Sequence, residues 1–372
     1  MKKKKLKQNK LKQSGLGSKC PKKVKASSSG DKMHIIRSKT KVQLQESLAK
    51  NPWCAHGPTI LFERVSTDLG DNKNKNFYAC SAYRDRKECV AYFQADDNNL
   101  CIVSEEKMFK WKQILKRDSH GSRPQNQESL ISFCKDCSEV VMKESISHKD
   151  HKVIKLKEKE LSQPTLSGLL ISKHTSTKEA QYHFSKDTLD VLLNQFIFKS
   201  NENIRVVCVG TPRIHETIIS TKSKKAEYNV QSILLDIDER LGPIYDSCQS
   251  TWGTFCHYNM FNHFFFREIE QKDYLKFIGG NDHIIIVTDP PFGGKCELIG
   301  RTMRLIKEDI LHVRNKEPVA DYMWIFPYYM ERQIQYEIPG IRMSDFQVCY
   351  ETKDKNGYKD GLETGNSGCR KV

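Results

Sequence analysis

The chain has 372 residues and a formal net charge of +15. This length gives room for two or three domains, and the excess of Lys and Arg favours a polyanionic partner such as nucleic acid. No stretch approaches the roughly 18 apolar residues of a membrane span, and the N-terminus lacks the apolar core of a secretory signal. We therefore expect an intracellular protein without a membrane partner, whose 13 cysteines are metal ligands and buried thiols rather than disulfides.

Residues 1–50 form a basic arm that is predicted to be disordered. Lys2 to Lys5, together with Lys22, Lys23 and Lys25, lie among Ser, Gln and Gly with almost no large apolar side chains. Such a composition cannot bury a core. Three roles are open for the arm: a nuclear or nucleolar address, a non-specific RNA contact, or a solubilising tail.

Residues 51–100 are predicted to form a small module that needs a metal. Three short strands are expected at residues 59–62, 77–80 and 90–93, too few for a stable core by themselves. The segment supplies four zinc ligands of the Cys3His type, which are Cys54, His56, Cys80 and Cys89. Tetrahedral zinc fits this set. Cys101 is an alternative ligand, and incidental thiols with a surface His are the alternative to a metal site.

Aromatic and basic residues alternate in the same module. The aromatic members are Phe77, Tyr78, Tyr92 and Phe93, and the basic members are Arg84, Arg86 and Lys87. This mixture stacks bases and neutralises phosphates, so those side chains that are exposed are candidates for RNA binding.

Residues 101–162 are mostly charged, and we predict a helical segment that carries a second zinc site. Its ligands are Cys134 and Cys137, with two residues between them, followed by His148 and His151. The alternative is a reduced cysteine pair beside a polar helix with two histidines. Each set supplies four ligands and leaves no open position, so neither zinc is expected to be catalytic. Residues 163–180, with a Gln-Pro break, are predicted to be a linker or lid.

From residue 181 onward, apolar runs alternate with amphipathic segments. Strands are predicted at residues 204–209, 233–236, 254–258, 284–288 and 322–326, and helices at residues 187–198 and 297–313. Strands buried on both faces and separated by helices indicate an α/β fold with a doubly wound parallel sheet.

The carboxyl ends of three predicted strands carry residues suited to a cofactor. Gly210 and Thr211 end the first strand and let the backbone approach a ligand, although a simple strand-to-helix turn explains them equally well. Asp236 ends the next strand and suits ribose hydroxyls, whereas the nearby Asp238 is also a candidate helix cap. Asn259 and Met260, after the third strand, are candidate contacts to a cofactor's adenine.

Asp289-Pro290-Pro291-Phe292 follows an apolar run and is typical of enzymes that methylate an exocyclic amine of a nucleobase. The amine's lone pair is delocalised into the ring, so the Asp carboxylate and the next carbonyl must accept its two hydrogens and re-aim it. The prolines fix the loop. Phe292 would stack on an extruded base, which is worth about 1–3 kcal/mol. An ordinary proline turn is the alternative.

Together these motifs resemble the zinc-finger CCHC-domain-containing methyltransferases that form N6-methyladenosine in large-subunit ribosomal RNA. The resemblance runs from about residue 52 to about residue 351 and is most specific at residues 76–85, 208–216, 255–263, 288–294 and 324–328. It implies a GRF-type zinc finger, a Cys-Cys-His-His finger and a Rossmann-like class I methyltransferase domain over residues 181–372. S-adenosyl-L-methionine and zinc are the implied cofactors, and structured ribosomal RNA in the nucleus or nucleolus, and also in the cytoplasm, is the implied partner.

The resemblance also assigns residues. It implies that Asp289, Pro290 and Phe292 hold the base, and that Gly210, Thr211 and Asp236 hold the donor. Gln181 and Phe184 match a segment that closes over the donor in related enzymes. The fingers and the catalytic domain are implied to form the RNA surface together.

Two departures from the family pattern affect the expected function. Ala95 stands where an aromatic residue normally follows Phe93-Gln94. The C-terminal stretch loses the family pattern after Glu351, so we expect the methyltransferase domain to be truncated at its C-terminal end and to lack its last sheet strand, with an open edge beside residues 346–350. A chain that has lost turnover in this way would be a non-catalytic zinc-dependent RNA-binding protein. A further alternative is an enzyme of the same architecture that acts on another amine, in guanine or glutamine.

Overall fold

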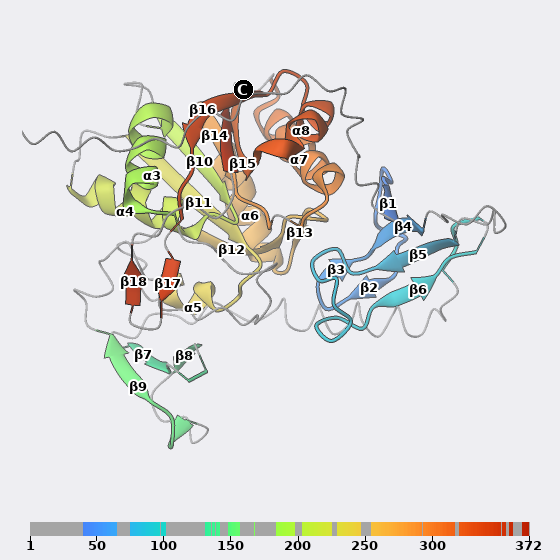
Figure 1. Ribbon diagram of the computed structural model, residues 1–372, viewed down its shortest axis with the longest axis horizontal. Helices are drawn as coiled ribbons and strands as arrows, with labels where there is room; N and C mark the ends of the chain where they lie inside the picture. Colours follow the sequence, from blue (N-terminus) through green and yellow to red (C-terminus); the bar gives the residue numbers. More distant parts are fainter. Residues whose placement is uncertain are drawn as a thin grey trace, which may run out of the picture. The chain divides into compact units, whose positions relative to one another are not determined.

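The central element of the computed structural model is an eight-stranded sheet (Figure 1). The strands lie in the order β13-β12-β11-β10-β14-β15-β19-β16. Their bounds in that order are Phe264–Phe265, Thr254–Asn259, Val230–Asp236, Ile204–Val209, His283–Thr288, Ala320–Pro327, Ser367–Lys371 and Arg342–Gln347. The strands β12, β11, β10, β14 and β15 are parallel, and β19 is antiparallel to both of its neighbours. Strand order reverses at β10, which is where open α/β sheets bind ligands.

The structure describes much of the chain from residue 40 onward. The described ranges are 40–64, 75–96, 98–101, 131–134, 136–137, 139–141, 148–156, 167, 184–197, 203–224, 229–246, 254–291, 293–316, 320–350, 352–354, 357–359 and 367–371. All of them belong to one compact unit. Gln181, Phe292, the arm up to residue 39 and most of the linker lie outside these ranges. Among the described helices, none is long and apolar enough to cross a membrane.

Helices cover both faces of the sheet and divide its core in two. On one face lie α3 (Lys186–Val191), the π-helix η3 that continues it (Leu192–Ile197), α4 (Pro212–Lys224) and α5 (Leu241–Asp246). On the other face lie α6 (Glu268–Ile278), α7 (Cys296–Arg314) and α8 (Glu331–Glu337), the last preceded by the 3-10 turn η4 (Tyr328–Met330). Because successive strand residues point to opposite faces, Val206 and Cys208 join the first core and Val207 and Val209 the second. The predicted doubly wound sheet is confirmed, including its five parallel strands.

The first small module contains a four-stranded antiparallel sheet of order β1-β4-β5-β6. The strands are β1 (Thr40–Gln43), β4 (Ile60–Arg64), β5 (Lys75–Ala79) and β6 (Tyr92–Gln94), and a short ribbon pairs β2 (Trp53–Cys54) with β3 (Gly57–Pro58). The presence of β1 corrects the prediction of disorder over residues 40–50, whereas residues 1–39 lie outside the described residues. Its backbone completes the edge of β4, and Val42 packs against the second core of the large sheet.

The second small module is a sheet of order β8-β7-β9 rather than the predicted helical segment. Its strands are β7 (Ile131–Cys134), β8 (Glu139–Val141) and β9 (Val153–Leu156). The helix prediction followed the charged composition of the whole stretch and missed the alternation around Phe133, which is buried. Residues 102–130 of that prediction lie outside the described residues.

The expected loss of the last sheet strand is wrong. Residues Ser367–Lys371 form β19, which inserts between β15 and β16 and pairs with both. A hairpin of β17 (Thr352–Asp354) and β18 (Gly357–Lys359) precedes it. β19 therefore pairs with one side of β16 from Arg342 to Gln347, and β16 itself is the outermost strand of the sheet.

Candidate functional site

Three predicted site residues meet where β10 and β14 end. Gly210 follows β10 with a φ of +67°, a conformation that glycine adopts without strain. A Cβ placed on Gly210 would lie 2.5 Å from Met260 Cε and 3.6 Å from the carbonyl oxygen of Asp289. Only a glycine fits at this position, because the Met260 methyl and the backbone of the Asp-Pro-Pro loop pack against the turn after β10. We call this junction of Gly210, Met260 and Asp289 the Gly210 cradle.

Asp289 lies within a small polar and aromatic cluster that sequence reasoning only partly identified. The hydroxyl of Tyr350 donates to Asp289 Oδ1 at 3.3 Å. The ring of Tyr350 stacks on the buried Phe184, with ring centroids 5.2 Å apart, and the two residues form an isolated β-bridge. Phe184 thus contacts Tyr350, which in turn bonds Asp289 of the Asp-Pro-Pro loop, and its predicted contact with a donor stays a prediction. Tyr350 was missed because no local pattern links it to Asp289, 61 residues away.

The burial of Asp289 changes its acidity. Burial raises the pKa of its carboxyl from 3.8 to about 8, and the hydrogen bond from Tyr350 acts in the opposite direction. A hydrogen bond to the ionised form favours that form, so Tyr350 helps to keep Asp289 an acceptor. The acceptor state is the one that can take a hydrogen from an amine.

The substitution Tyr350→Phe should therefore move the pH dependence of activity. In the native protein we expect kcat/KM to rise with pH as Asp289 ionises, with an apparent pKa near 8. Loss of the donated hydrogen bond should shift this rising limb to higher pH, so the variant loses most activity below the native pKa and least above it. Steady-state rates from about pH 6 to about pH 10 measure the effect. Superimposable profiles would refute the coupling.

The proline pair fixes the backbone of the loop. Pro290 is buried and Pro291 is exposed. The N–H of Gly294 donates to the carbonyl of Pro291 at 2.6 Å, and a Cβ on Gly294 would lie only 2.9 Å from that oxygen. This turn uses the carbonyl of Pro291 for the loop's own structure. Phe292, the predicted stacking residue, lies outside the described residues.

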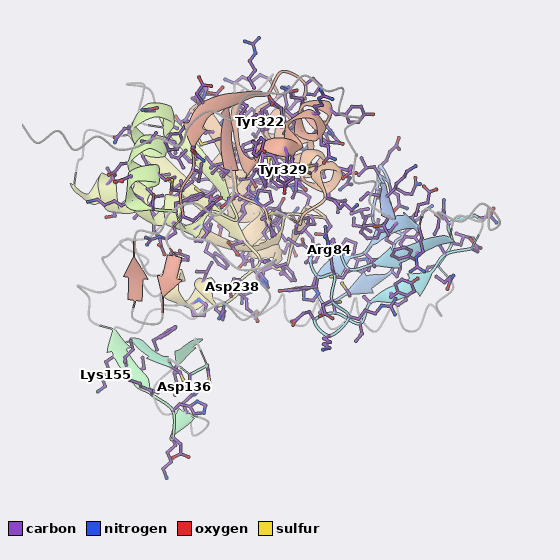
Figure 2. The ribbon with its side chains drawn as sticks, viewed as in Figure 1. Arg84, Asp136, Lys155, Asp238, Tyr322 and Tyr329 are labelled. Atoms are coloured by element: carbon purple, nitrogen blue, oxygen red, sulfur yellow. The ribbon has the colours of Figure 1, made fainter. Side chains whose placement is uncertain are left out.

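The two acids after β11 have different environments. Asp236 is buried, accepts a hydrogen bond from the N–H of Asp238 at 2.9 Å, and has a pKa that burial raises to about 7. Asp238, on the loop before α5 (Figure 2), accepts from Arg240 Nε at 2.7 Å, and its carbonyl accepts the N–H of Leu241. Asp238 is thus engaged in starting α5. Asp236, at the carboxyl end of the strand next to β10, remains the candidate for ribose hydroxyls.

Asn259 has a different role from the predicted cofactor contact. Its amide nitrogen donates to the carbonyl of His56 at 2.8 Å and to Ser81 Oγ at 2.9 Å. Its side-chain oxygen accepts the N–H of Phe261 at 3.0 Å. Both the nitrogen and the oxygen of the Asn259 side chain form hydrogen bonds within the protein, so the prediction that this side chain contacts a cofactor is corrected. The neighbouring Met260 does face the Gly210 cradle.

A buried network links the start of α4 to the linker. Thr211 is buried directly before the helix, and its carbonyl accepts the N–H of His215 at 3.2 Å. The fully buried Glu216 accepts from the N–H and hydroxyl of Ser167 at 2.7 and 2.9 Å and from the hydroxyl of Tyr245 at 2.9 Å. Burial raises the pKa of Glu216. No local pattern predicts this network, which attaches Ser167 to α4.

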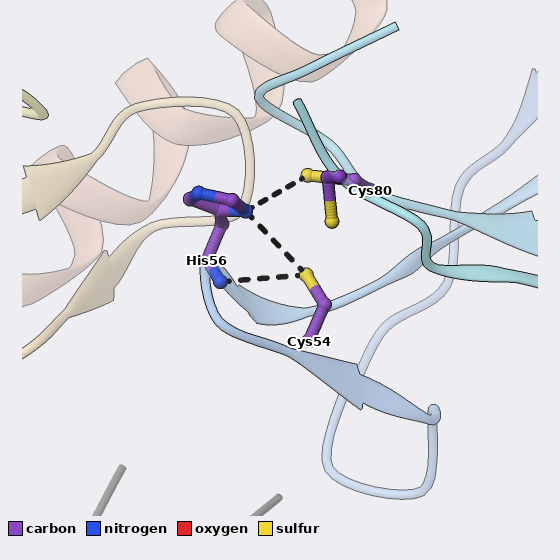
Figure 3. Close-up of side chains that lie close together, drawn as sticks. Cys54, His56 and Cys80 are labelled. Carbon is purple, nitrogen blue, oxygen red and sulfur yellow. Dashed lines mark hydrogen bonds between the residues drawn. The ribbon is translucent and has the colours of Figure 1, made fainter. Parts of the chain in front are cut away.

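The first predicted metal site is assembled as expected (Figure 3). The ligand atoms of Cys54, His56, Cys80 and Cys89 all lie within 4.8 Å of one another. His56 Nδ1 is 3.5 Å from Cys80 Sγ and 4.0 Å from Cys54 Sγ. A tetrahedron with Zn–S of about 2.3 Å and Zn–N of about 2.0 Å has S–N edges of about 3.6 Å. The residues therefore fit zinc, and Cys101 is not a member of the group.

The thiols of this site share their hydrogen bonds unequally. Hydrogen bonding with Cys80 and Cys89 holds the pKa of Cys54 well above its usual range. Hydrogen bonding from Cys54 and Cys80 holds the pKa of Cys89 well below it. One thiol thus ionises readily at the expense of another, because several thiolates without a cation repel each other. A divalent metal ion removes this conflict.

The second predicted metal site is assembled from the ends of the β7 sheet. Cys134, Cys137, His148 and His151 bring their ligand atoms within 4.8 Å of one another. His151 Nδ1 lies 3.6 Å from Cys134 Sγ and 3.2 Å from Cys137 Sγ. These separations again match the edges of a tetrahedral zinc site.

Comparison with known proteins agrees with this geometry. The family described as "Probable N6-adenine methyltransferase" matches residues 175–360, which is half of the chain. The chain belongs to this family. The family described as GRF zinc finger matches residues 52–99, so the first metal site lies in a GRF finger. The match covers the first module and all four of its ligands.

Two relatives match most of the chain. The chain is 34% identical to the rRNA N(6)-adenosine-methyltransferase ZCCHC4 of Xenopus tropicalis over 82% of this chain and 63% of that protein. It is 33% identical to the Homo sapiens protein of the same name, over 81% of this chain and 59% of that protein. The chain thus spans about three fifths of the length of these family members.

Solved structures match less closely. TrmN from Thermus thermophilus is 13% identical, with a TM-score of 0.26 over 49% of this chain and 47% of that chain. A predicted O-methyltransferase from Agrobacterium tumefaciens is 11% identical, with a TM-score of 0.29 over 46% of this chain and 74% of that chain. The Rossmann-like fold follows from the strand order described above.

Proposed function

We propose that the protein transfers a methyl group from S-adenosylmethionine to the N6 amine of an adenine in large-subunit ribosomal RNA. The observation that carries the proposal is the position of Asp289 at the end of β14, beside the Gly210 cradle and held by Tyr350. A base acceptor and a donor cradle at the same switch point of the sheet are what an amine methyltransferase needs. The names of the relatives supply the substrate class.

The protein's own residues have separate roles in this reaction. The Asp289 carboxylate accepts one hydrogen of the amine, and the rigid Pro290 segment fixes the direction of the neighbouring carbonyl. Gly210 and Met260 shape the donor cradle, and Asp236 suits the donor's ribose hydroxyls. S-adenosylmethionine supplies the electrophilic methyl group when bound. No strong base is required, because the proton can leave after the amine has become cationic.

The GRF finger extends a cation toward the catalytic loop. A Cβ placed on Gly293, two residues after Pro291, would lie 3.3 Å from Arg84 Nη1. Lys295 follows in the same loop, and its Nζ donates to the carbonyl of Thr40 at 2.8 Å. Burial lowers the pKa of Lys295, the charge of Glu297 raises it, and the positive charge of Arg84 lowers it further. Two cations that repel each other beside the base-binding loop favour an anion between them. A phosphate next to the target nucleotide is the ligand of that kind which RNA brings.

Arg84→Ala should accordingly weaken RNA binding more than it slows chemistry. We expect KM for RNA to rise about fivefold and the slope of log affinity against log salt to fall by about 0.7. Arg86→Ala is a matched control, because the guanidinium of Arg86 lies over the Tyr92 ring, 4.1 Å from its centroid. Rates and binding measured over a salt series test the assignment. Equal effects of the two substitutions would show that Arg84 acts only through the charge of the finger.

The direct test of the proposed function uses the full chain loaded with zinc. The protein is incubated with labelled S-adenosylmethionine and large-subunit ribosomal RNA, and the RNA is digested to nucleosides for mass spectrometry. We expect label in N6-methyladenosine. Label in a methylguanosine, or in a protein glutamine, would identify one of the alternative amines instead. Absence of transfer despite tight RNA binding would favour the non-catalytic RNA-binding alternative.

Cellular location is part of the same proposal. The basic arm and the ribosomal substrate favour a location in the nucleus and nucleolus. A second fraction of the protein is expected in the cytoplasm. A fluorescent fusion with and without residues 1–39 tests the role of the arm. Unchanged nucleolar signal after removal of the arm would assign targeting to RNA binding rather than to the arm.

A further inference from the structure

Two buried asparagines at the end of β12 bind the loop that carries a zinc ligand. Asn259 is 0% exposed and Asn262 is 4% exposed. Their side-chain nitrogens donate to the same acceptor, the carbonyl oxygen of His56, at 2.8 and 3.2 Å. His56 is separated from them by more than 200 residues and supplies Nδ1 to the GRF metal site. One residue thus binds the metal with its side chain and the asparagines with its backbone.

Neighbouring contacts hold the same two loops together. Asn262 also donates to the carbonyl of Pro58 at 2.9 Å. Gly57 has a φ of +93°, and a Cβ on it would lie 2.6 Å from the ring of Phe264. The ring of Trp53 meets Phe264 edge-on, with centroids 5.3 Å apart. The zinc loop is therefore fitted onto the turn that follows β12 without room for a side chain at Gly57.

The turn after β12 also forms one wall of the donor cradle. Met260, between the two asparagines, has its Cε 2.5 Å from the position of a Cβ on Gly210. Its carbonyl accepts from Thr302 Oγ1 at 2.6 Å. Asn259 Oδ1 accepts the N–H of Phe261, which closes the turn around Met260. The position of Met260 thus depends on the amide of Asn259, and that amide depends on His56.

We propose that Asn259 and Asn262 are positioning residues through which zinc in the GRF site shapes the methyl-donor pocket. The metal fixes His56, the carbonyl of His56 fixes the two amides, and the amides fix Met260 against Gly210. The proposal rests on the proposed function for the existence of a donor pocket. Coupling between two binding sites is reciprocal, so a bound donor product must stabilise zinc in the GRF site by the same factor.

The reciprocal effect can be measured residue by residue in the full zinc-loaded chain. Cysteines are labelled with N-ethylmaleimide in the presence of a chelator, with and without saturating S-adenosylhomocysteine, and mass spectrometry follows each peptide. We expect the bound nucleoside to slow labelling of Cys54, Cys80 and Cys89 by about tenfold, as for one buried hydrogen bond. Labelling of Cys134 and Cys137, in the second metal site, is expected to be unchanged.

Substitution of the asparagines also tests the coupling between the GRF zinc site and the donor pocket. Asn259→Ala and Asn262→Ala should each weaken binding of S-adenosylhomocysteine by about tenfold in calorimetry. They should also remove the protection of the GRF cysteines while the zinc content stays at its native value. Asn259→Asp, which keeps the oxygen but loses the donated hydrogens, should behave like Asn259→Ala, whereas Ser81→Ala should have a smaller effect.

The outcomes separate this inference from the proposed function. If the native protein does not bind S-adenosylhomocysteine, both are overturned. If it binds but all cysteines are labelled at the same rate with and without the nucleoside, only the zinc coupling is overturned. Should an asparagine variant fail to fold, the labelling of the native protein decides the question alone.

Discussion

Replacing Asp289 with alanine is expected to lower methyl transfer by about 100- to 1,000-fold, comparable to the loss of one preorganised polar group at a reacting centre. The carboxylate is held by Tyr350 and lies beside the donor cradle. Its removal leaves only the neighbouring backbone carbonyl of this loop to accept a hydrogen from the amine. The effect should appear in kcat, with binding of S-adenosylhomocysteine little changed. Labelled S-adenosylmethionine with ribosomal RNA provides the rate.

Two further variants make the Asp289 result specific. Asp289→Asn keeps an acceptor oxygen that does not titrate, so it should retain part of the activity and lose the rising limb of the pH profile. Asp321→Ala is a matched control, because Asp321 lies near the start of β15, at the opposite end of the neighbouring strand, where it pairs with His283. Native activity in Asp289→Ala would rule out the amine-positioning role.

Cys80→Ala is expected to abolish zinc binding at the GRF site and to unfold the finger. Loss of an outer-shell partner costs about 10- to 100-fold in metal affinity, so loss of a ligand should cost at least about 100-fold. The finger's own core is small, because it consists of Cys54, Leu61, Tyr78, Cys80, Ala91 and Phe93. Two of these six are zinc ligands. Removal of the metal therefore removes both a cross-link and part of the core.

Metal content and folding measured together test this expectation. Elemental analysis should fall by one zinc per chain, and hydrogen exchange should lose protection in β4 and β5 while the central strand β10 keeps it. Cys101→Ala is the control, because Cys101 lies outside the metal group and pairs with Ala95 through a backbone β-bridge. This substitution should leave the zinc content unchanged. Loss of zinc in the control would reassign the ligand set.

Local patterns in the sequence were enough to predict the main sheet and the metal ligands. Strands buried on both faces are continuous apolar runs, so β10 and β14 are visible without any knowledge of their neighbours. Zinc ligands are recognisable because a small module without a core needs them, and both predicted sets of ligands come together. The Asp-Pro-Pro loop is recognisable because its chemistry requires those residue types in succession.

Features that depend on partners distant in the chain were decided only by the tertiary structure. The pairing of β1 with the finger and of β19 with the large sheet corrected two predictions, because short polar strands are stabilised by neighbours that their own composition does not reveal. Asn259 changed from a cofactor contact to a bond with His56 for the same reason. An amide side chain has the same appearance in the sequence whether it binds a ligand or a backbone carbonyl. Only the folded chain fixes which acceptor lies within hydrogen-bonding distance.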